Sequence, residues 1–111
     1  MKSLTFRLAL AVACAVVASA ASAELATGRV TKIGCHNTDD ECWVTLSGFT
    51  QSQYCNQFYE LRWSASTSWG NRWYAMLMAA SVSGQVVTLA VSANTCSVQG
   101  YPTFEWGYVV G

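Results

Sequence analysis

The stretch from residue 72 to residue 91 decides the fold and reads RWYAMLMAASVSGQVVTLAV. Its first twelve residues are mostly good helix formers, and Gly84 follows them where a glycine commonly ends a helix. The seven residues after Gly84 are apolar on both faces, which is typical of a buried central strand. We therefore predict a helix over Arg72–Ser83, capped by Asn71 or Ser68, and a central strand directly after it.

Further strands are predicted on both sides of this unit, because β-branched and aromatic residues are bounded there by turn-forming residues. They cover Ala26–Ile33, Cys42–Leu46 with an extension to Phe49, and Phe58–Trp63 before the helix, and Phe104–Val110 at the end of the chain. The order strand-strand-strand-helix-strand-strand predicts a mainly β fold with one helix, a five-stranded OB-type barrel. An α+β sandwich with an open sheet is the alternative.

The alternation of residues within two of these strands predicts which side chains face solvent. In the third strand, Glu60 and Arg62 alternate with apolar residues and are expected on a wet face. In the last strand, the large apolar side chains are expected to share one face; these are Phe104, Trp106, Tyr108 and Val110.

The first 23 residues have the pattern of an export signal. Lys2 and Arg7 form a basic start, Leu8–Ala18 is an apolar run, and Ala21–Ala23 supplies a small-x-small cleavage site. We predict cleavage before Glu24, which leaves 88 residues, enough for one domain.

The predicted domain therefore covers residues 24–111, and its location is secreted or periplasmic. The apolar run of the signal is short for a bilayer and no second long apolar run follows, so no membrane span is expected. Cys14 raises the alternative of a lipoprotein. We disfavour it because Ala11 stands where a bulky aliphatic residue would be expected.

The charge and aromatic content of the predicted domain narrow its function. Cleavage leaves four basic and six acidic residues, a net charge of −2, so binding to nucleic acid through phosphate contacts is not expected. Thirteen of the 88 residues are aromatic, more than a small core needs. This surplus favours a surface that binds a ligand or a partner.

Four cysteines remain after cleavage, and an even number in an exported chain predicts two disulfides. Three pairings are possible. We favour Cys35 with Cys42 and Cys55 with Cys96, because residues 36–41 read as a loop that joins two adjacent strands. A zinc site is disfavoured because no Cys-x2-Cys pair is present.

Catalytic constellations are missing from the sequence pattern. His36 is the one histidine, and it lies in a loop beside a cysteine that is expected to be oxidised. Asp39, Asp40 and Glu41 are sequence neighbours, so they are poorly placed to act from two sides of a substrate. The same run lacks the spacing of a calcium loop and reads as a solvated turn. We predict no enzymatic activity, no metal and no cofactor.

Two polar segments have the residues of a sugar site, which needs an aromatic face beside donors and acceptors. The first holds Tyr54 and Asn56 next to a cysteine, and the second holds Trp69 with Ser68 and Asn71. These five residues are the predicted ligand-binding set. The alternatives are that Trp69 folds back as a lid on one end of the barrel and that Tyr54 packs in the core.

The helix carries no charge between Trp73 and Val82, and its apolar side chains surround its whole circumference. A small domain cannot bury such a helix on every side. We therefore predict an interface with a second copy of the chain through Trp73, Met76, Leu77 and Ala80. The alternative is an outer face of alanine and serine that water tolerates.

Several segments resemble small exported bacterial proteins similar to the B subunit of subtilase cytotoxin. The likeness rests on residues 72–91, on Thr95-Cys96 and Tyr101-Pro102, and on Thr27–Ile33. The resemblance implies an OB-fold B subunit that assembles as a ring of five, with the helix near the ring's centre. It also implies binding to cell-surface glycans and raises an A subunit as a partner. It assigns no sugar-contacting residue to this chain.

The sequence thus predicts an exported, non-enzymatic protein that binds a cell-surface glycan as a homo-oligomer. The alternative is an envelope interaction protein, an inhibitor or accessory subunit, which grips another protein with its apolar helix.

Overall fold

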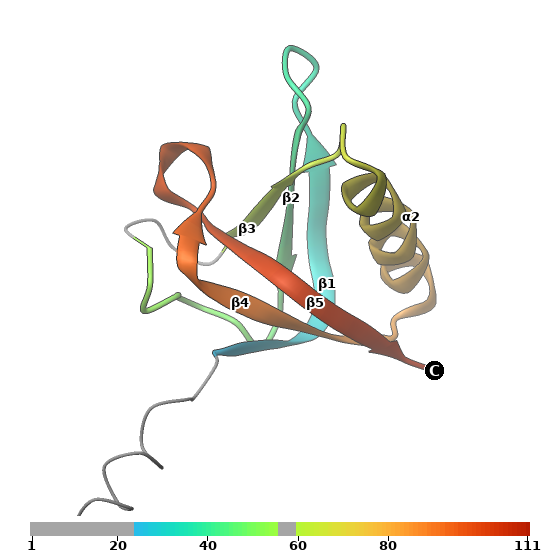
Figure 1. Ribbon diagram of the computed structural model, residues 1–111. Helices are drawn as coiled ribbons and strands as arrows, with labels where there is room; N and C mark the ends of the chain where they lie inside the picture. Colours follow the sequence, from blue (N-terminus) through green and yellow to red (C-terminus); the bar gives the residue numbers. More distant parts are fainter. Residues whose placement is uncertain (1–23, 56–59) are drawn as a thin grey trace, which may run out of the picture.

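The computed structural model describes residues 24–55 and 60–111. The expected signal segment and the prediction for Asn56 lie outside the described residues. Figure 1 shows a curled sheet with one helix at its side. The elements are β1 (Leu25–Cys35), β2 (Glu41–Leu46), β3 (Glu60–Ser64), α2 (Ser68–Ser83), β4 (Val86–Cys96), a short 3-10 helix (Val98–Gly100) and β5 (Pro102–Val110). The predicted mainly β fold with one helix is confirmed.

The five strands form one antiparallel sheet in the order β3-β2-β1-β4-β5. Strand β1 belongs to both halves of the sheet, because residues 25–29 pair with β4 and residues 30–35 pair with β2. A register shift at Thr31 separates the two halves, as Val30 pairs with Leu46 and Lys32 with Thr45. Such a bulge bends a strand and increases its twist, so β1 can turn from one half to the other. Strand β4 lies between β1 and β5, as the sequence predicted for a central strand.

The two outer strands, β3 and β5, approach each other without backbone pairing. The sheet is therefore not closed, and the OB-type barrel of the prediction is not confirmed. We call the unpaired gap between β3 and β5 the seam.

Helix α2 begins earlier than predicted. Its N-cap is Thr67, whose Oγ1 accepts a hydrogen bond from the Gly70 amide at 2.9 Å, so neither Asn71 nor Ser68 is the cap. A Cβ at position 70 would collide with the carbonyl oxygen of Ser64, so glycine lets the first turn lie against the end of β3. The helix ends as predicted at Gly84, which has a φ of 70° and donates its amide to Ala80.

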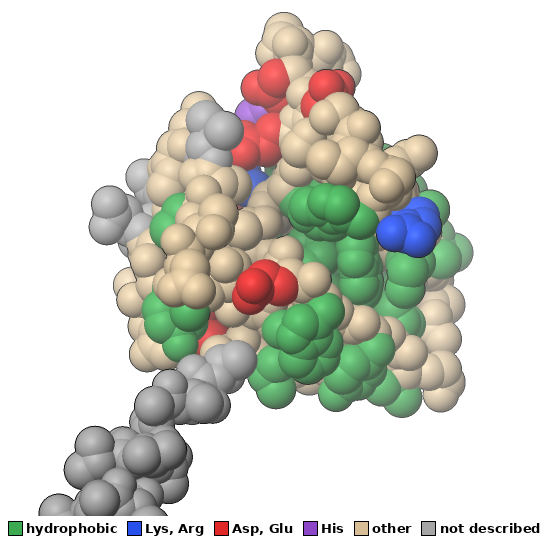
Figure 2. Space-filling model, in the orientation of Figure 1, with side chains coloured by type: hydrophobic (Ala, Val, Ile, Leu, Met, Phe, Trp, Pro, Cys, Tyr) green, Lys and Arg blue, Asp and Glu red, His purple; other side chains and the backbone are tan. Residues whose placement is uncertain are grey.

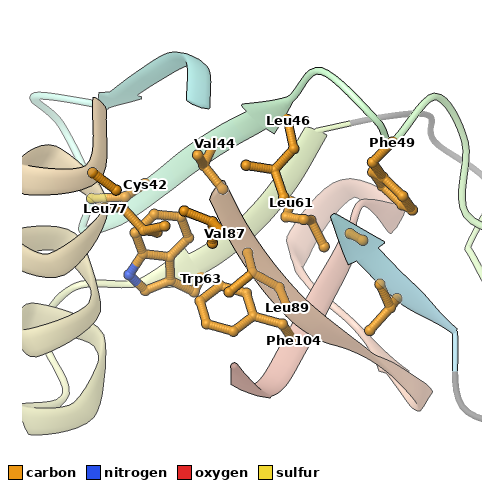
Figure 3. Close-up of a cluster of buried hydrophobic side chains, with 13 residues drawn as sticks. Cys42, Val44, Leu46, Phe49, Leu61, Trp63, Leu77, Val87, Leu89 and Phe104 are labelled. Carbon is orange, nitrogen blue, oxygen red and sulfur yellow. The ribbon is translucent and has the colours of Figure 1, made fainter. Parts of the chain in front are cut away.

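The core lies between the inner face of the sheet and α2. Figure 3 shows Trp63 of β3 with Leu77 of the helix on one side and Phe104 of β5 on the other. The Trp63 indole donates a buried hydrogen bond of 2.9 Å to the Gly70 carbonyl, which satisfies its polar group. The remaining buried apolar side chains include Ala26, Cys42, Val44, Leu46, Phe49, Leu61, Ala80, Val87, Leu89 and Val91.

Strand β5 does not keep its large apolar side chains on one face, so that prediction was wrong. Ala90 pairs with Trp106 and Val91 pairs with Phe104, so Glu105 is an extra residue on β5. One extra residue reverses the alternation of side chains. As a result Phe104 is buried, whereas Trp106 and the alternate residues after it are about half exposed.

Both predicted disulfides are confirmed, as Cys35 bonds to Cys42 and Cys55 bonds to Cys96. The first joins paired positions of β1 and β2. The second ties the segment after β2 to the end of β4. Two disulfides fit an oxidising location outside the cytoplasm, extracellular or periplasmic.

Two of the four residues predicted for an interface are unavailable to a partner. Leu77 and Ala80 are 0% and 1% exposed, because this stripe of α2 packs against the chain's own core. Trp73 is half-buried against the same core, and Met76 is 43% exposed. Besides Trp69, the large apolar side chains of the helix that stay exposed are those of Met76, Met78 and Val82. At about 100° per residue, Met78 and Val82 share one side of the helix and Met76 lies on another.

Candidate functional site

Four aromatic rings fill one end of the seam. The ring of Phe104 from β5 makes edge-to-face contacts with three indoles, those of Trp63 from β3 and of Trp69 and Trp73 from α2, with ring centroids 5.3 to 6.1 Å apart. Aromatic pairs prefer such edge-to-face geometry. Side chains therefore join β3, α2 and β5 at a point where no backbone pairing does so.

A cleft of about 560 Å³ opens beside these rings. It lies between the β1–β2 turn, the end of β3, the start of α2 and the connection from β4 to β5. Its lining residues are Asp39, Asp40, Glu41, Trp63, Ser64, Trp69, Thr95, Cys96, Ser97, Gln99 and Thr103. We call it the seam cleft. Its volume lies in the usual range of sites for small ligands.

Trp69 is the exposed aromatic side chain of the seam cleft. It is 39% exposed and also lines an adjoining hollow of about 400 Å³ that reaches Ser92 and Glu105. Its indole N–H makes no hydrogen bond within residues 24–55 and 60–111. Trp69 thus has features of both predicted roles, because its ring makes an edge-to-face contact with Phe104 and also lines the cleft.

Polar groups with free hydrogen-bonding capacity surround this indole. The Asp40 carboxylate and the Thr95 and Thr103 hydroxyls line the cleft, and none of them makes a side-chain hydrogen bond within the described part of the chain. Gln99 uses its Oε1 to accept from Arg62 and keeps its amide N–H groups for another acceptor. The cleft therefore offers donors and acceptors beside an apolar ring.

Arg62 is hydrogen-bonded to Glu41 and Gln99, two residues that line the cleft. Arg62 is 9% exposed, so the prediction that its side chain faces solvent is wrong. Its guanidinium donates to Glu60 at 2.8 Å, to Glu41 at 3.1 Å and to Gln99 at 3.2 Å. It also lies 3.7 Å from the centroid of the Tyr101 ring, and this ring and Trp43 cover it.

The pKa of Arg62 follows from these contacts. Burial alone would lower it, but the hydrogen bonds with Glu60 and Glu41 outweigh burial and leave the pKa above its ordinary value. Arg62 is therefore a permanent positive charge that two carboxylates neutralise.

Gln99 has the backbone of a strained position. Its φ of 74° lies in the left-handed region, which a residue with a Cβ rarely adopts. The hydrogen bond to Arg62 ties this loop residue to β3 across the seam. The unfavourable backbone conformation thus occurs at a residue that is hydrogen-bonded to Arg62 and lines the cleft.

The turn between β1 and β2 is held by Asp39. Its Oδ1 accepts from the Glu41 amide at 3.0 Å and lies 3.1 Å from Nδ1 of His36. The amide of Glu41 and then His36 lower the pKa of the Asp39 carboxyl below its ordinary value. Because Asp39 is occupied in this way, Asp40 is the carboxylate of the turn that is free for a ligand.

The structure brings one of the five predicted ligand residues into the cleft, and that residue is Trp69. Tyr54 is partly buried and packs against the core, which was the stated alternative. Ser68 and Asn71 are exposed on the first turn of α2 and do not line the cleft. Asn56 lies outside the described residues.

Sequence reasoning missed the polar wall of the cleft. Asp40 was read as part of a solvated turn, Thr95 and Gln99 lay in the loop expected between the last two strands, and Thr103 lay just before the last predicted strand. The sequence signal nearest to them was Cys96, whose disulfide with Cys55 holds the end of β4, where Thr95 lies.

Among residues 24–55 and 60–111, no three histidine, cysteine, aspartate or glutamate side chains converge to hold a metal ion. None of the helices in the same residues is long and apolar enough to cross a membrane.

No protein-family model, curated protein or solved structure matches the chain. The resemblance to subtilase cytotoxin B subunits is therefore not supported by these comparisons.

Proposed function

We propose that this protein is an exported, non-enzymatic protein that binds glycans in the seam cleft. The observation that carries the proposal is the partly exposed Trp69 indole in a cleft with carboxylate and hydroxyl groups that have no side-chain hydrogen bond within residues 24–55 and 60–111. The N–H groups of the Gln99 amide add donors to the same cleft. A sugar ring presents a C–H face and a rim of hydroxyls, which match an aromatic face and such polar groups.

The carboxylates near the cleft support binding rather than catalysis. Glu41 is hydrogen-bonded to Arg62, and Asp39 is occupied by the turn that it stabilises. Among the residues that line the seam cleft itself, this leaves the Asp40 carboxylate free to contact a ligand, with Glu105 in the adjoining hollow. Glycoside hydrolysis ordinarily needs a pair of carboxyl groups on two sides of the bond.

Replacing Trp69 by alanine is expected to lower glycan affinity at least tenfold, because the stacking platform is removed. The free energy of unfolding should fall by about 1–2 kcal/mol, since Trp69 contributes one edge contact and is 39% exposed. A glycan array identifies the ligand, calorimetry measures the affinity, and urea unfolding measures the stability.

Trp106→Ala is the matched control, because Trp106 is 53% exposed and lies outside the cleft. Its affinity should equal that of the unmodified protein. Loss of binding in Trp106→Ala with none in Trp69→Ala would move the site to the outer face of β5 and refute the seam cleft.

We propose in addition that copies of the chain associate. The support is the number of exposed large apolar side chains: Met78 and Val82 on one side of α2, Met76 on another, and alternate residues of β5. Figure 2 shows apolar side chains gathered at the lower right of the molecule, over the C-terminal half of β5. Apolar patches of this kind commonly mark protein contacts.

Light scattering on the purified, oxidised protein is expected to give a mass of several protomers, near five for a ring like that of the B subunits. Val82→Glu, at a position 86% exposed, should lower this mass if the helix lies in the interface. Val110→Glu makes the same change on β5 and tests the other patch. A monomer at high concentration would contradict the association of copies.

The second candidate function is binding to a different protein through these same apolar surfaces. A monomeric protein that binds no glycan but forms a stoichiometric complex with one envelope protein would favour it. Loss of that complex in Val82→Glu or Val110→Glu would locate the contact.

A further inference from the structure

The charges of the seam cleft indicate which sugars it can accept. Asp39, Asp40 and Glu41 line one side, and Glu105 lines the adjoining hollow. Figure 2 shows acidic side chains gathered at the top of this face, around the β1–β2 turn. The described part of the chain places no lysine in the lining of either space.

The basic residues are not available to offset these carboxylates. Arg62 lies behind the wall, where Glu60 and Glu41 neutralise it. Arg29 donates to the carbonyl of Gly84, at the far end of α2 from Trp69. Lys32 and Arg72 line neither the cleft nor the adjoining hollow. A ligand in the cleft therefore meets an excess of negative charge.

Two groups among the residues that line the cleft can attract a cation. The Asp40 carboxylate has no hydrogen-bond partner within the described residues, and it can accept a charge-assisted hydrogen bond. The partly exposed Trp69 ring attracts cations through its π face. An ammonium group on a sugar could use both, whereas a carboxylate on a sugar would be repelled by the first.

We propose that the seam cleft prefers sugars that carry a free amine and rejects acidic sugars such as sialic acids. This inference rests on the proposed glycan-binding function and adds the class of sugar. In this proposal the cleft and its exposed indole bind the sugar ring, and the carboxylates set the preference for positively charged over negatively charged sugars.

The test compares matched ligands by calorimetry at mildly acidic pH, where a sugar amine is protonated. A glucosamine trimer should bind at least fivefold more tightly than an N-acetylglucosamine trimer, the factor expected for one charge pair at about 4 Å in water. Lactose should bind at least fivefold more tightly than sialyl-lactose. In 1 M salt, where the Debye length is about 3 Å, both differences should shrink.

Asp40→Asn should remove most of the preference for the amine while binding of the neutral trimer persists. Ser81→Lys is the matched control, because Ser81 is exposed and its change raises the net charge by the same +1 about 18 Å along α2 from Trp69. It should leave the preference unchanged. A loss of preference in both variants would mean that the net charge of the protein, and not the carboxylate in the cleft, causes the preference for the amine. That result would overturn the inference.

The remaining outcomes separate this inference from the proposed function. Tighter binding of sialyl-lactose than of lactose would overturn the charge preference and leave glycan binding standing. Equal affinity for trilysine and for the glucosamine trimer would show that the cleft binds any positively charged ligand. That result would overturn both the preference for amino sugars and the proposed glycan-binding function. Binding of no sugar at all would refute the proposed function.

Discussion

Replacing Arg62 by methionine is expected to lower the free energy of unfolding by about 3–5 kcal/mol. The methionine keeps apolar packing between Trp43 and Tyr101 but removes the cation from two carboxylates. Their side chains are only 11% exposed in Glu41 and 21% in Glu60, so neither can recover the lost interaction from water. Urea unfolding followed by tryptophan fluorescence measures the change.

The control for Arg62 adds Glu41→Gln and Glu60→Gln to the methionine variant. Without buried charges to leave unpaired, the triple variant should recover most of the lost stability. If Arg62→Met alone costs less than about 1 kcal/mol, the ion pairs behave as surface contacts and the buried position of Arg62 is contradicted.

Replacing Cys55 and Cys96 together by alanine is expected to cost about 4 kcal/mol. The disulfide closes a loop with a sequence separation of 41, and cross-linking a loop of this length restricts the unfolded chain strongly. The same change should weaken glycan binding, because the bond fixes the loop that brings Thr95 and Gln99 to the cleft. Thermal unfolding and calorimetry measure the two effects.

The matched control is the double alanine variant of Cys35 and Cys42. Its loop has a sequence separation of 7, so the expected cost is only about 2.4 kcal/mol. Neither of these cysteines lines the cleft. A larger cost for the short loop than for the long loop would contradict the loop-entropy reasoning for this chain.

Much of the fold could be predicted because its signals are local. Gly84 ends the helix by its own backbone freedom, and β-branched or aromatic runs between turn residues gave the strands. The cysteine pairing was predicted because the polar segment 36–41 reads as a loop between neighbouring strands. The start of α2 was misplaced because its cap is Thr67, one residue before the earlier of the two candidates.

Other features depend on contacts between distant segments. The faces of β5 were assigned wrongly because the prediction assumed a regular alternation of side chains. The bulge at Glu105 interrupts that alternation, and it is fixed by pairing with β4. Arg62 was expected in water, because its cover comes from Trp43 and from Tyr101 in a later loop. Leu77 and Ala80 were assigned to an interface, since the helix pattern alone does not show which stripe meets the core.

One part of the candidate site could be predicted from the sequence and the other part could not. Trp69 was predicted from its polar surroundings in the sequence, because an indole among serines has few apolar neighbours nearby in the chain. The cleft beside it combines the β1–β2 turn with residues some 55 to 60 positions later. A periodic pattern cannot report such a juxtaposition.

The sequence by itself determined the main element types, their order and the end of the helix, and it favoured one cysteine pairing of three, because these follow from backbone preferences and short-range spacing. Only the tertiary structure decided that β3 and β5 stay unpaired, that Arg62 is buried against two aromatic rings, and that Asp40 and Trp69 line the same cleft. The physical reason is that burial and charge pairing are set by the residues that meet in space. Here those residues come from segments that only the curl of the sheet brings together.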